Sequence, residues 1–572
     1  MYYTNIEGVI DYILLQRGKG EIQMLACREE VSKLTEKLVQ KKSVVNSSGE
    51  REMGDFLYKL ISSFPYFHRF PNQLMKQETY GDSNLRYNIV AYVKGTKGRS
   101  SSTVILMGHL DTVGIDDFGK LKELACDPER LASALSEENV PLDVKEQIQS
   151  GKFLVGRGSL DMKSGIASHL YLLKYFSDHP EELKGNIVVL FTCDEEDSSN
   201  GILSAVPLLN ELKVKEQFRY LAAINADFVT PLYEGDENRY IFKGTVGKLL
   251  PSFFIVGTET HAGSPFDGLD PNFLASYLTK EICYNPALVN EAAGELTMPP
   301  VSLKQTDLKP AYDVQTPWSA FCYYNFFVHS WSPFDVLQLL KKHAKIAFKQ
   351  ALDDYHKRYA QYAEAAGIPY KEKPWKARVY SFEELNTLLE NEHGFKYIKH
   401  MQDFKQKLLE DESLDLRMYS ARVVEESWKW MKDKGPAMIL FYSSIYLPRI
   451  EVSEKSKRER RLLQALDYAI EQVQPYYPYP IITKNFFPYI SDMSFMSISD
   501  DGEAIDTVIN NSPAWGTKFS VKYDEISDLN VPVINIGPYG YDGHKKYERV
   551  EIEYSHQIVP NLTKLVIENL LN

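Results

Sequence analysis

The stretch ILMGHLDTVG, residues 105–114, joins a short apolar run to a histidine and an aspartate that are two residues apart. The apolar run at 105–107 predicts a buried strand that ends at Gly108. His109 and Asp111 follow directly. Both residue types are common in turns, so the stretch alone is compatible with an ordinary turn. At the end of a buried strand, however, an imidazole and a carboxylate also suit a catalytic or metal-binding site.

Strand and helix patterns alternate around this stretch. EREMGDFLYKLISSF (50–64) and DMKSGIASHLYLLKYFSDHP (161–180) have apolar residues at helical spacing. GNIVVLFTCDEE (185–196) and YLAAINADF (220–228) indicate buried strands with acidic ends. Alternation of this kind predicts an α/β fold with a mostly parallel sheet and helices on both faces, and a site along the carboxyl ends of the strands.

The pattern changes after about residue 240. KLLPSFFIVGTETHAGSP (248–265) and SAFCYYNFFVHS (319–330) indicate longer strands, and charged helical segments follow them. The buried-strand pattern returns at GPAMILFYSSIYLP (435–448). The sequence therefore predicts a catalytic domain in two parts, 1–240 and 436–572, interrupted by an inserted α+β lid domain with a helical extension at 241–435.

The bulk properties limit the class of protein. A chain of 572 residues is too long for one hydrophobic core, and its net charge of −13 argues against a nucleic-acid binder. The first 20 residues carry Glu7 and Asp11 within their apolar part, which is unfavourable for a secretory signal. No apolar run is long enough to cross a membrane. The cysteines are scattered and odd in number, which favours reduced thiols and the cytoplasm: Cys27, Cys126, Cys193, Cys283 and Cys322.

Side chains of the kind that bind divalent metal ions stand at successive strand ends or in loops. They are His109, Asp161, Glu195, Glu196, Asp227 and His544. Imidazoles and carboxylates without a thiolate suit zinc or a similar ion in a hydrolytic site, and their number suits two ions that share a carboxylate. Singly, each has an ordinary alternative, such as a helix cap for Asp161 or a surface position for His544. His556 competes with His544 as a ligand.

Five segments resemble, in this order, the signature segments of a zinc metallopeptidase family: HLDTV, GRGSLDMKSG, TCDEEDSSNG, THAGSP followed by PN, and GHKKYERV. This family includes carboxypeptidase G, succinyl-diaminopimelate desuccinylase, aminoacylase and several di- and tripeptidases. The resemblance covers nearly the whole chain. The length, the insert and FFPYISDMSF resemble most closely the branch that contains the arginine-utilisation protein RocB.

The resemblance implies two divalent metal ions, zinc with cobalt or manganese as alternatives. His109 and Asp227 would bind one ion. Glu196 and His544 would bind the other, and Asp161 would bridge the two.

Two further carboxylates acquire roles through the same resemblance. Asp111 would accept the N–H of the His109 imidazole and so fix the orientation of that ring. Glu195 would act as the general base that takes a proton from the attacking water and passes it to the leaving amine.

The lid carries two more residues that match the family. His261 would donate a hydrogen bond to the carbonyl oxygen as it becomes an oxyanion, and Asn272 would have a similar polar role. In dimeric relatives this histidine reaches the site of the other subunit. Because the insert is long, we expect the lid to fold over the site of its own chain, although a homodimer stays open.

One position departs from the family pattern. Many relatives carry a lid arginine that grips the free carboxylate of the substrate, whereas Asn325 stands at the comparable place. Arg378 or Arg449 would have to substitute for it. In SDMSF, Ser491 and Asp492 are expected to cap a helix, with contact to substrate as the alternative.

The predicted function is hydrolysis of an amide bond in a short peptide or an N-acyl amino acid, an arginine-related one being a candidate, with no nucleic-acid or membrane partner. One rival is a non-catalytic relative that binds metal and acts as a binding module, but all candidate site residues are present. The other is a metallophosphatase, which would need phosphate-binding cations; the chain offers Arg157 and Lys163 close to Asp161 but no Gly-rich anion cradle.

Overall fold

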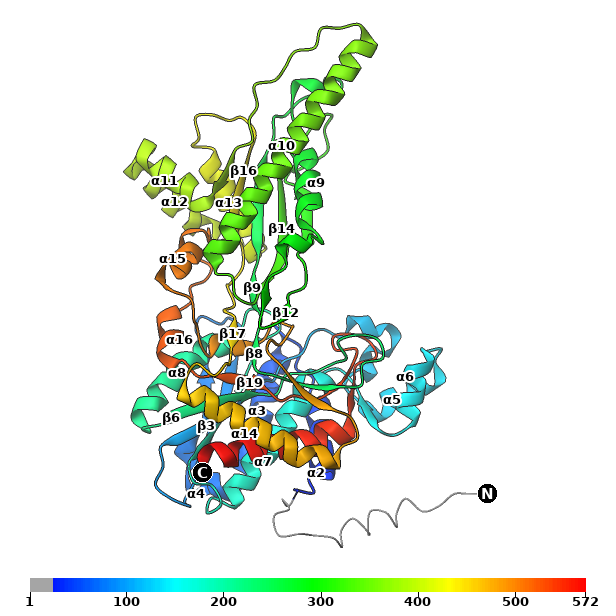
Figure 1. Cartoon of the computed structure of the whole chain (residues 1–572), viewed down its shortest axis with the longest axis vertical. Helices are drawn as coiled ribbons and strands as arrows, with labels where there is room; N and C mark the ends of the chain where they lie inside the picture. Colours follow the sequence, from blue (N-terminus) through cyan, green and yellow to red (C-terminus); the bar gives the residue numbers. More distant parts are fainter. Residues whose placement is uncertain (1–23) are drawn as a thin grey trace.

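The computed structural model describes residues 24–572, and the first 20 residues, on which the signal-peptide prediction rests, lie outside that range. The chain forms two units (Figure 1). We call the unit around the eight-stranded sheet the sheet domain and the unit around the six-stranded sheet the lid. Between residues 24 and 572, no helix has the length and apolar character needed to cross a membrane. All five cysteines are free thiols.

The sheet domain is built on a mixed sheet with a parallel centre. Its strand order is β1-β2-β5-β3-β6-β19-β7-β18. Neighbours from β5 to β19 are parallel, whereas the pairs β1–β2, β2–β5 and β19–β7 are antiparallel. The strands are β1 (Leu74–Glu78), β2 (Tyr87–Lys94), β5 (Asn186–Thr192), β3 (Ser102–His109), β6 (Arg219–Asn225), β19 (Val533–Asn535), β7 (Arg239–Phe242) and β18 (Ile481–Lys484). The α/β prediction is confirmed, including its parallel core.

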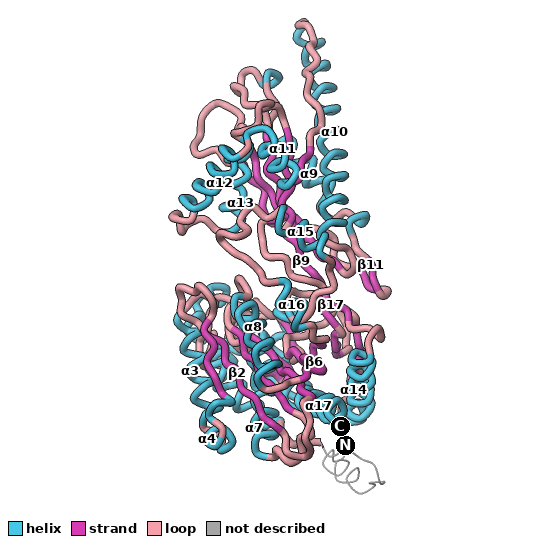
Figure 2. Tube along the Cα trace, turned by 90° about the vertical axis from the view of Figure 1, so that its left-hand side faces the viewer, coloured by secondary structure: helices cyan, strands magenta, loops and turns pink. Residues whose placement is uncertain are grey.

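Helices cover both faces of this sheet. α7 and α8 each pack on β2 and β5 but belong to different helix layers, and Figure 2 shows the strands between helices. One layer contains α2 (Arg28–Val39), α7 (Ser164–Asp178), α14 (Lys457–Val473) and α17 (Val559–Leu571). The other contains α8 (Asn200–Lys215) and α16 (Tyr523–Leu529). Smaller elements border the sheet: α3 (Ser48–Ser62), α4 (Pro65–Arg69), α5 (Pro128–Glu137), α6 (Leu142–Gln149), β4 (Phe153–Val155), β20 (Gly540–Tyr541) and β21 (Arg549–Glu551).

The lid is an α+β unit. Its sheet has the order β13-β14-β10-β16-β15, and β9 pairs with the far end of β14. The strands are β9 (Gly247–Leu249), β10 (Pro251–Val256), β13 (Val301–Asp307), β14 (Ser319–Val328), β15 (Val379–Ser381) and β16 (Ala437–Tyr442). The helices are α9 (Pro271–Ile282), α10 (Pro333–Ala366), α11 (Phe382–His393), α12 (Phe395–Leu408) and α13 (Leu416–Trp428). Two short strand pairs, β8 (Gly244–Thr245) with β17 (Ile450–Glu451) and β11 (Glu291–Ala292) with β12 (Glu295–Leu296), complete the set.

The returning segment after residue 435 contributes to both units. β16 pairs antiparallel with β10 and parallel with β15, so it lies inside the lid sheet. α15 (Gly502–Asn510) also packs against the lid helix α10. The division at residue 435 stays a prediction, but these contacts favour a boundary after Tyr442.

Hydrogen bonds of one side chain join the carboxyl ends of β6 and β19. The Asn535 side chain accepts the backbone N–H of Asp227 at 2.9 Å and donates to its carbonyl oxygen at 2.8 Å. A Cβ placed on Gly537 would lie 1.6 Å from that same carbonyl oxygen. The chain after β19 therefore needs glycine to approach the backbone of Asp227.

Gly537→Ala tests this close approach. We expect it to lower the free energy of unfolding by about 3 kcal/mol, because the backbone that it meets cannot move aside as a flexible side chain would. The measurement is the midpoint of urea unfolding. Gly502→Ala is the matched control, since a Cβ there has open space around it. Equal stability of the two variants would contradict the packing argument.

Candidate metal centre

The parallel strands bring their carboxyl ends to one edge of the sheet. His109 on β3 lies opposite Thr192 on β5, and Met107 on β3 lies opposite Asn225 on β6. The residues that follow these ends are therefore neighbours in space although they are far apart in the chain. His109 and Asp227 come from strand ends, and Glu195 comes from the turn just beyond β5.

Asp161 lies between two imidazoles. Its Oδ1 is 3.0 Å from Nε2 of His109, and its Oδ2 is 2.8 Å from Nε2 of His544. The same Nε2 of His544 is 3.1 Å from Oε1 of Glu196. His109, Asp161 and Glu196 each offer a ligand atom within 4.8 Å of the others. One carboxylate thus faces a nitrogen donor with each of its oxygens, an arrangement suited to bridging two ions.

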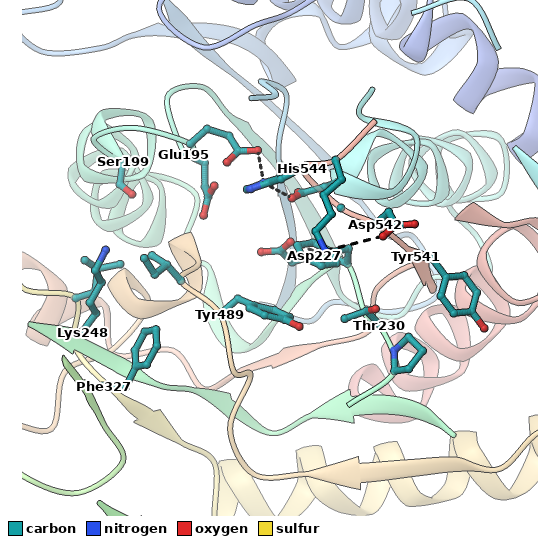
Figure 3. Close-up of a pocket in the computed structure, with 18 of the residues that line it drawn as sticks. Glu195, Ser199, Asp227, Thr230, Lys248, Phe327, Tyr489, Tyr541, Asp542 and His544 are labelled. Atoms are coloured by element: carbon teal, nitrogen blue, oxygen red, sulfur yellow. Dashed lines mark hydrogen bonds and ion pairs between the residues drawn. The ribbon is translucent and has the colours of Figure 1, made fainter. Parts of the chain in front are cut away.

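Asp161, Glu196 and His544 line one pocket of about 1360 Å³, and the buried His109 is not among its lining residues. Glu195, Asp227 and His544 lie around its centre (Figure 3). Lys248 and Phe327 of the lid lie on one side of them, and Tyr541 and Asp542 lie on the other. The pocket is therefore formed jointly by the strand ends of the sheet domain and by the base of the lid.

Buried negative charge exceeds buried positive charge at this site. Burial raises the pKa of Asp227 to about 7 and that of Asp492 to about 7, and the nearby carboxylates Asp161 and Asp111 act in the same direction. Burial also raises the pKa of Glu195, although His109 opposes it, and neighbouring carboxylates add to the rise. Ionised carboxylates packed this closely are unfavourable unless a cation compensates them. The side chains present therefore fit divalent metal ions.

Asp111 contacts His109, but the nearer contact is made by its backbone carbonyl oxygen and not by the carboxylate that we predicted. Nδ1 of His109 is 3.1 Å from the backbone carbonyl oxygen of Asp111 and 3.6 Å from its carboxylate Oδ1. The other carboxylate oxygen accepts the backbone N–H of Glu196 at 3.1 Å. Asp111 therefore orients the imidazole through its main chain and the acidic turn through its side chain.

A buried ion network that the sequence did not reveal holds the acidic turn. Arg86 donates to Oδ1 of Asp194 at 2.7 Å, and Glu50 accepts the backbone N–H of Asp194 at 3.0 Å. Asp194 has a φ of 64° and accepts the backbone N–H of Asn200 at the start of α8. The turn that carries Glu195 is thus held from behind. In the sequence, the only sign of this network is Asp194, which directly precedes the two glutamates.

A second buried pair holds the Asp161 segment. Oε1 of Glu548 accepts the backbone N–H groups of Leu160 and Asp161, and Oε2 accepts from Arg157 at 2.6 Å. Lys163 donates to the carbonyl oxygen of Lys41. Arg157 and Lys163 are both buried and bonded inside the protein. These two cations, which the metallophosphatase alternative would need for binding phosphate, therefore do not face the pocket.

Two alternatives from the sequence are resolved by position. His556 is buried and contacts Ser32 and Ser164, so it lies apart from the carboxylates that His544 contacts. Ser491 accepts the N–H of Met493 as a cap, as expected. Asp492 has no capping hydrogen bond, contrary to the expectation: it is buried, it accepts from Thr192 at 2.7 Å, and its charge influences the pKa of Glu195.

His261 and Asn272 lie away from this pocket. Close to His261 in the chain, Phe266 stacks on Tyr359 of α10 with ring centroids 4.6 Å apart. The first residue of that helix, Pro333, accepts a hydrogen bond from Tyr442 at the base of the lid. At 1.5 Å per residue, Tyr359 is about 40 Å further along α10, toward the far end of the lid (Figure 1). The lid does not bring His261 over the site of its own chain, contrary to our expectation.

Both arginines that were considered as replacements for the missing lid arginine are engaged elsewhere. Arg378 pairs with Asp433 at 2.8 Å, and Arg449 pairs with Asp500 at 2.6 Å. Neither lines the pocket.

Asn272, the second lid residue of the prediction, donates to Asp307 within the lid and does not line the pocket.

Comparison with known proteins defines the class. The model of peptidase family M20/M25/M40 matches residues 105–516, and the chain belongs to this family, which makes it a metal-dependent peptidase or amidohydrolase. Protein RocB of Bacillus subtilis is 40% identical over 546 residues, covering 95% of each chain. Succinyl-diaminopimelate desuccinylase of Xanthomonas campestris pv. campestris is 26% identical, covering 39% of this chain and 52% of its own. The M20 family metallo-carboxypeptidase Sso-CP2 of Sulfolobus solfataricus shares the fold, with a TM-score of 0.52, 12% identity and coverage of 95% and 100%.

The acidic site predicts how stability depends on pH. Without metal, we expect the free energy of unfolding to fall as pH rises from about 4 to 7. Asp227 and Asp492 have a pKa of about 7 when folded, whereas unfolded carboxyl groups have a pKa near 4. Between these values the folded state binds more protons than the unfolded state, so stability decreases with pH.

His544 reinforces this trend above about pH 6.5. Burial lowers its pKa, but hydrogen bonds with Asp161 and Glu196 outweigh burial and raise it to about 11, so the folded state keeps a proton that the unfolded state loses. The measurement is urea unfolding at pH 5 and 7.5, with a chelator and with excess zinc. Stability of the chelated protein that increases with pH would contradict this prediction.

Proposed function

We propose that the protein is a hydrolase that uses two divalent metal ions, zinc with cobalt or manganese as alternatives, to cleave an amide bond in a short peptide or an N-acyl amino acid. The observation that carries this proposal is the position of Asp161, whose two oxygens face the Nε2 atoms of His109 and His544. His109 and Asp227 would hold one ion, and Glu196 and His544 the other. The chemistry that the ions supply when bound is activation of water at near-neutral pH.

Glu195 is the proposed general base and acid. Its Oε2 is 3.9 Å from Nε2 of His109, and the side chain lines the pocket. Burial and nearby carboxylates raise its pKa, which makes its carboxylate a stronger base toward water. As the water oxygen bonds to the carbonyl carbon, a carboxylate oxygen of Glu195 takes the proton. It then gives this proton to the amide nitrogen as the carbon–nitrogen bond breaks.

The proposed substrate class rests on the relatives of the chain and on the charged residues near the site. The desuccinylase that matches part of the chain is named for removing an acyl group, which supports an N-acyl amino acid beside a short peptide. Similarity to RocB supports an arginine-related substrate as one candidate. Arg157 and Lys163, the cations that the sequence offered for a phosphate ester, are engaged inside the protein, and membership of the peptidase family favours an amide.

Glu195→Gln tests the proposed chemistry. We expect kcat for the best dipeptide or N-acyl amino acid to fall about 100- to 10,000-fold, because the amide cannot accept the proton. Metal content, measured by elemental analysis, should stay at two ions per chain. Glu211→Gln, at an exposed position of α8, is the matched control. Two bound ions without turnover in the wild type would instead favour the binding-module rival.

We further propose that a second copy of the chain completes the site. His261 lies near the far end of the lid, so it can reach a reacting carbonyl only in another molecule. An imidazole N–H delivered there would stabilise the negative charge that develops on the carbonyl oxygen. The oligomeric state expected on this basis is a homodimer.

Mixing two inactive variants tests the homodimer. Chains with His261→Ala and chains with Glu195→Gln should regain about a quarter of the wild-type activity after exchange of subunits, since half of the dimers are mixed and each mixed dimer has one intact site. Light scattering gives the mass, and differently tagged chains verify the exchange. A monomeric mass, or no recovery in verified mixed dimers, would contradict the proposal.

A further inference from the structure

Two cations at the base of the lid have no anionic partner. Lys248 stands in β9 and Arg417 in the first turn of α13, and both line the pocket of the metal centre. Within residues 24–572, neither side chain makes a hydrogen bond or an ion pair, in contrast to the paired Arg378 and Arg449. A charged group that is partly buried and unpaired suits an external ligand.

The strand register places Lys248 beside the residue that departs from the family pattern. Lys248 on β9 lies opposite Phe327 on β14. Asn325 precedes Phe327 by two residues and therefore lies on the same face of the sheet, diagonal to Lys248. Many relatives have an arginine at the position of Asn325 on β14. In this chain a cation, Lys248, stands instead on the adjacent strand β9. Both Lys248 and Phe327 face the pocket in Figure 3.

The electrostatic environment of Lys248 also favours an anion. Burial, together with the charge of Arg417, lowers the pKa of Lys248 to about 8, and Glu195 opposes this only in part. Two cations held close together repel each other, and an anion bound between them would relieve that repulsion. Lys248 lies on the lid side of the central residues, on the side opposite Asp542.

We propose that Lys248 and Arg417 form the subsite that binds a carboxylate of the substrate, beside the amide bond to be cleaved. This inference rests on the proposed function and narrows its substrate class to amides with a free carboxylate on the lid side of the site. Such a carboxylate belongs either to the carboxyl end of a dipeptide or to the amino-acid part of an N-acyl amino acid. Ile445 and Leu447 line the same pocket and can contact apolar parts of the substrate.

Equilibrium binding without turnover tests the subsite. Metal-loaded Glu195→Gln protein is titrated calorimetrically with N-acetyl-L-leucine, N-acetyl-L-arginine and L-leucyl-L-leucine, each as the free acid and as the primary amide. We expect at least one acid to bind about 10- to 100-fold more tightly than its amide, the range expected for hydrogen bonds to charged groups. The probe with the largest preference distinguishes an acyl amino acid from a dipeptide.

The same titrations with added substitutions assign the preference to residues. Lys248→Met and Arg417→Met keep long side chains but remove the charge, and each should reduce the acid preference to less than about threefold. Lys304→Met, at an exposed position of β13, is the control and should leave it unchanged. Because a carboxylate can also bind the metal ions, a preference that survives both pocket substitutions would overturn the proposal.

The result separates this inference from the proposed function. Equal binding of acid and amide by the metal-loaded protein would overturn the carboxylate subsite even if wild-type enzyme cleaves neutral amides. Conversely, a strong acid preference that depends on Lys248 would support the subsite even if the wild type cleaves none of the probes. In that case only the assignment of amide hydrolysis would fail.

Discussion

The contact on which the rest of the structure depends is that of Asp161 with two imidazoles. His109 and His544 are separated by more than 400 residues, yet each places Nε2 within 3.0 Å of one oxygen of the same buried carboxylate. Around this contact lie more buried carboxylates than cations, and burial raises the pKa of several of them. Either protons or bound cations would compensate this excess of negative charge.

The surrounding fold holds the donors in place against their own repulsion. Glu548 binds the backbone before Asp161, and Arg157 neutralises Glu548 from within the protein. Asn535 holds the backbone of Asp227 on both sides. These groups act through the backbone, so they orient the donors without occupying the pocket. Positions of this kind carry no recognisable chemistry in the sequence, which is why Glu548 and Asn535 escaped sequence analysis.

The two ends of the lid carry different candidate functional residues. Lys248, Phe327 and Arg417 at the base of the lid line the pocket. His261 lies near the far end, where the neighbouring Phe266 packs on the long helix α10. Hydrophobic patterning could identify the lid strands, but it could not show that β16 returns to the lid sheet. Pairing between distant strands depends on the register of the whole sheet and not on local composition.

The sequence by itself determined the α/β class, the order of the site motifs and the candidate donors, because strand ends in a parallel sheet meet at one edge whatever the details of packing. Only the tertiary structure decided which groups face the pocket. It turned Arg157 and Lys163 inward and placed Lys248 beside Asn325, and it separated His261 from the site of its own chain. The physical reason is that side-chain direction and long-range distance follow from packing between distant segments, which no local pattern contains.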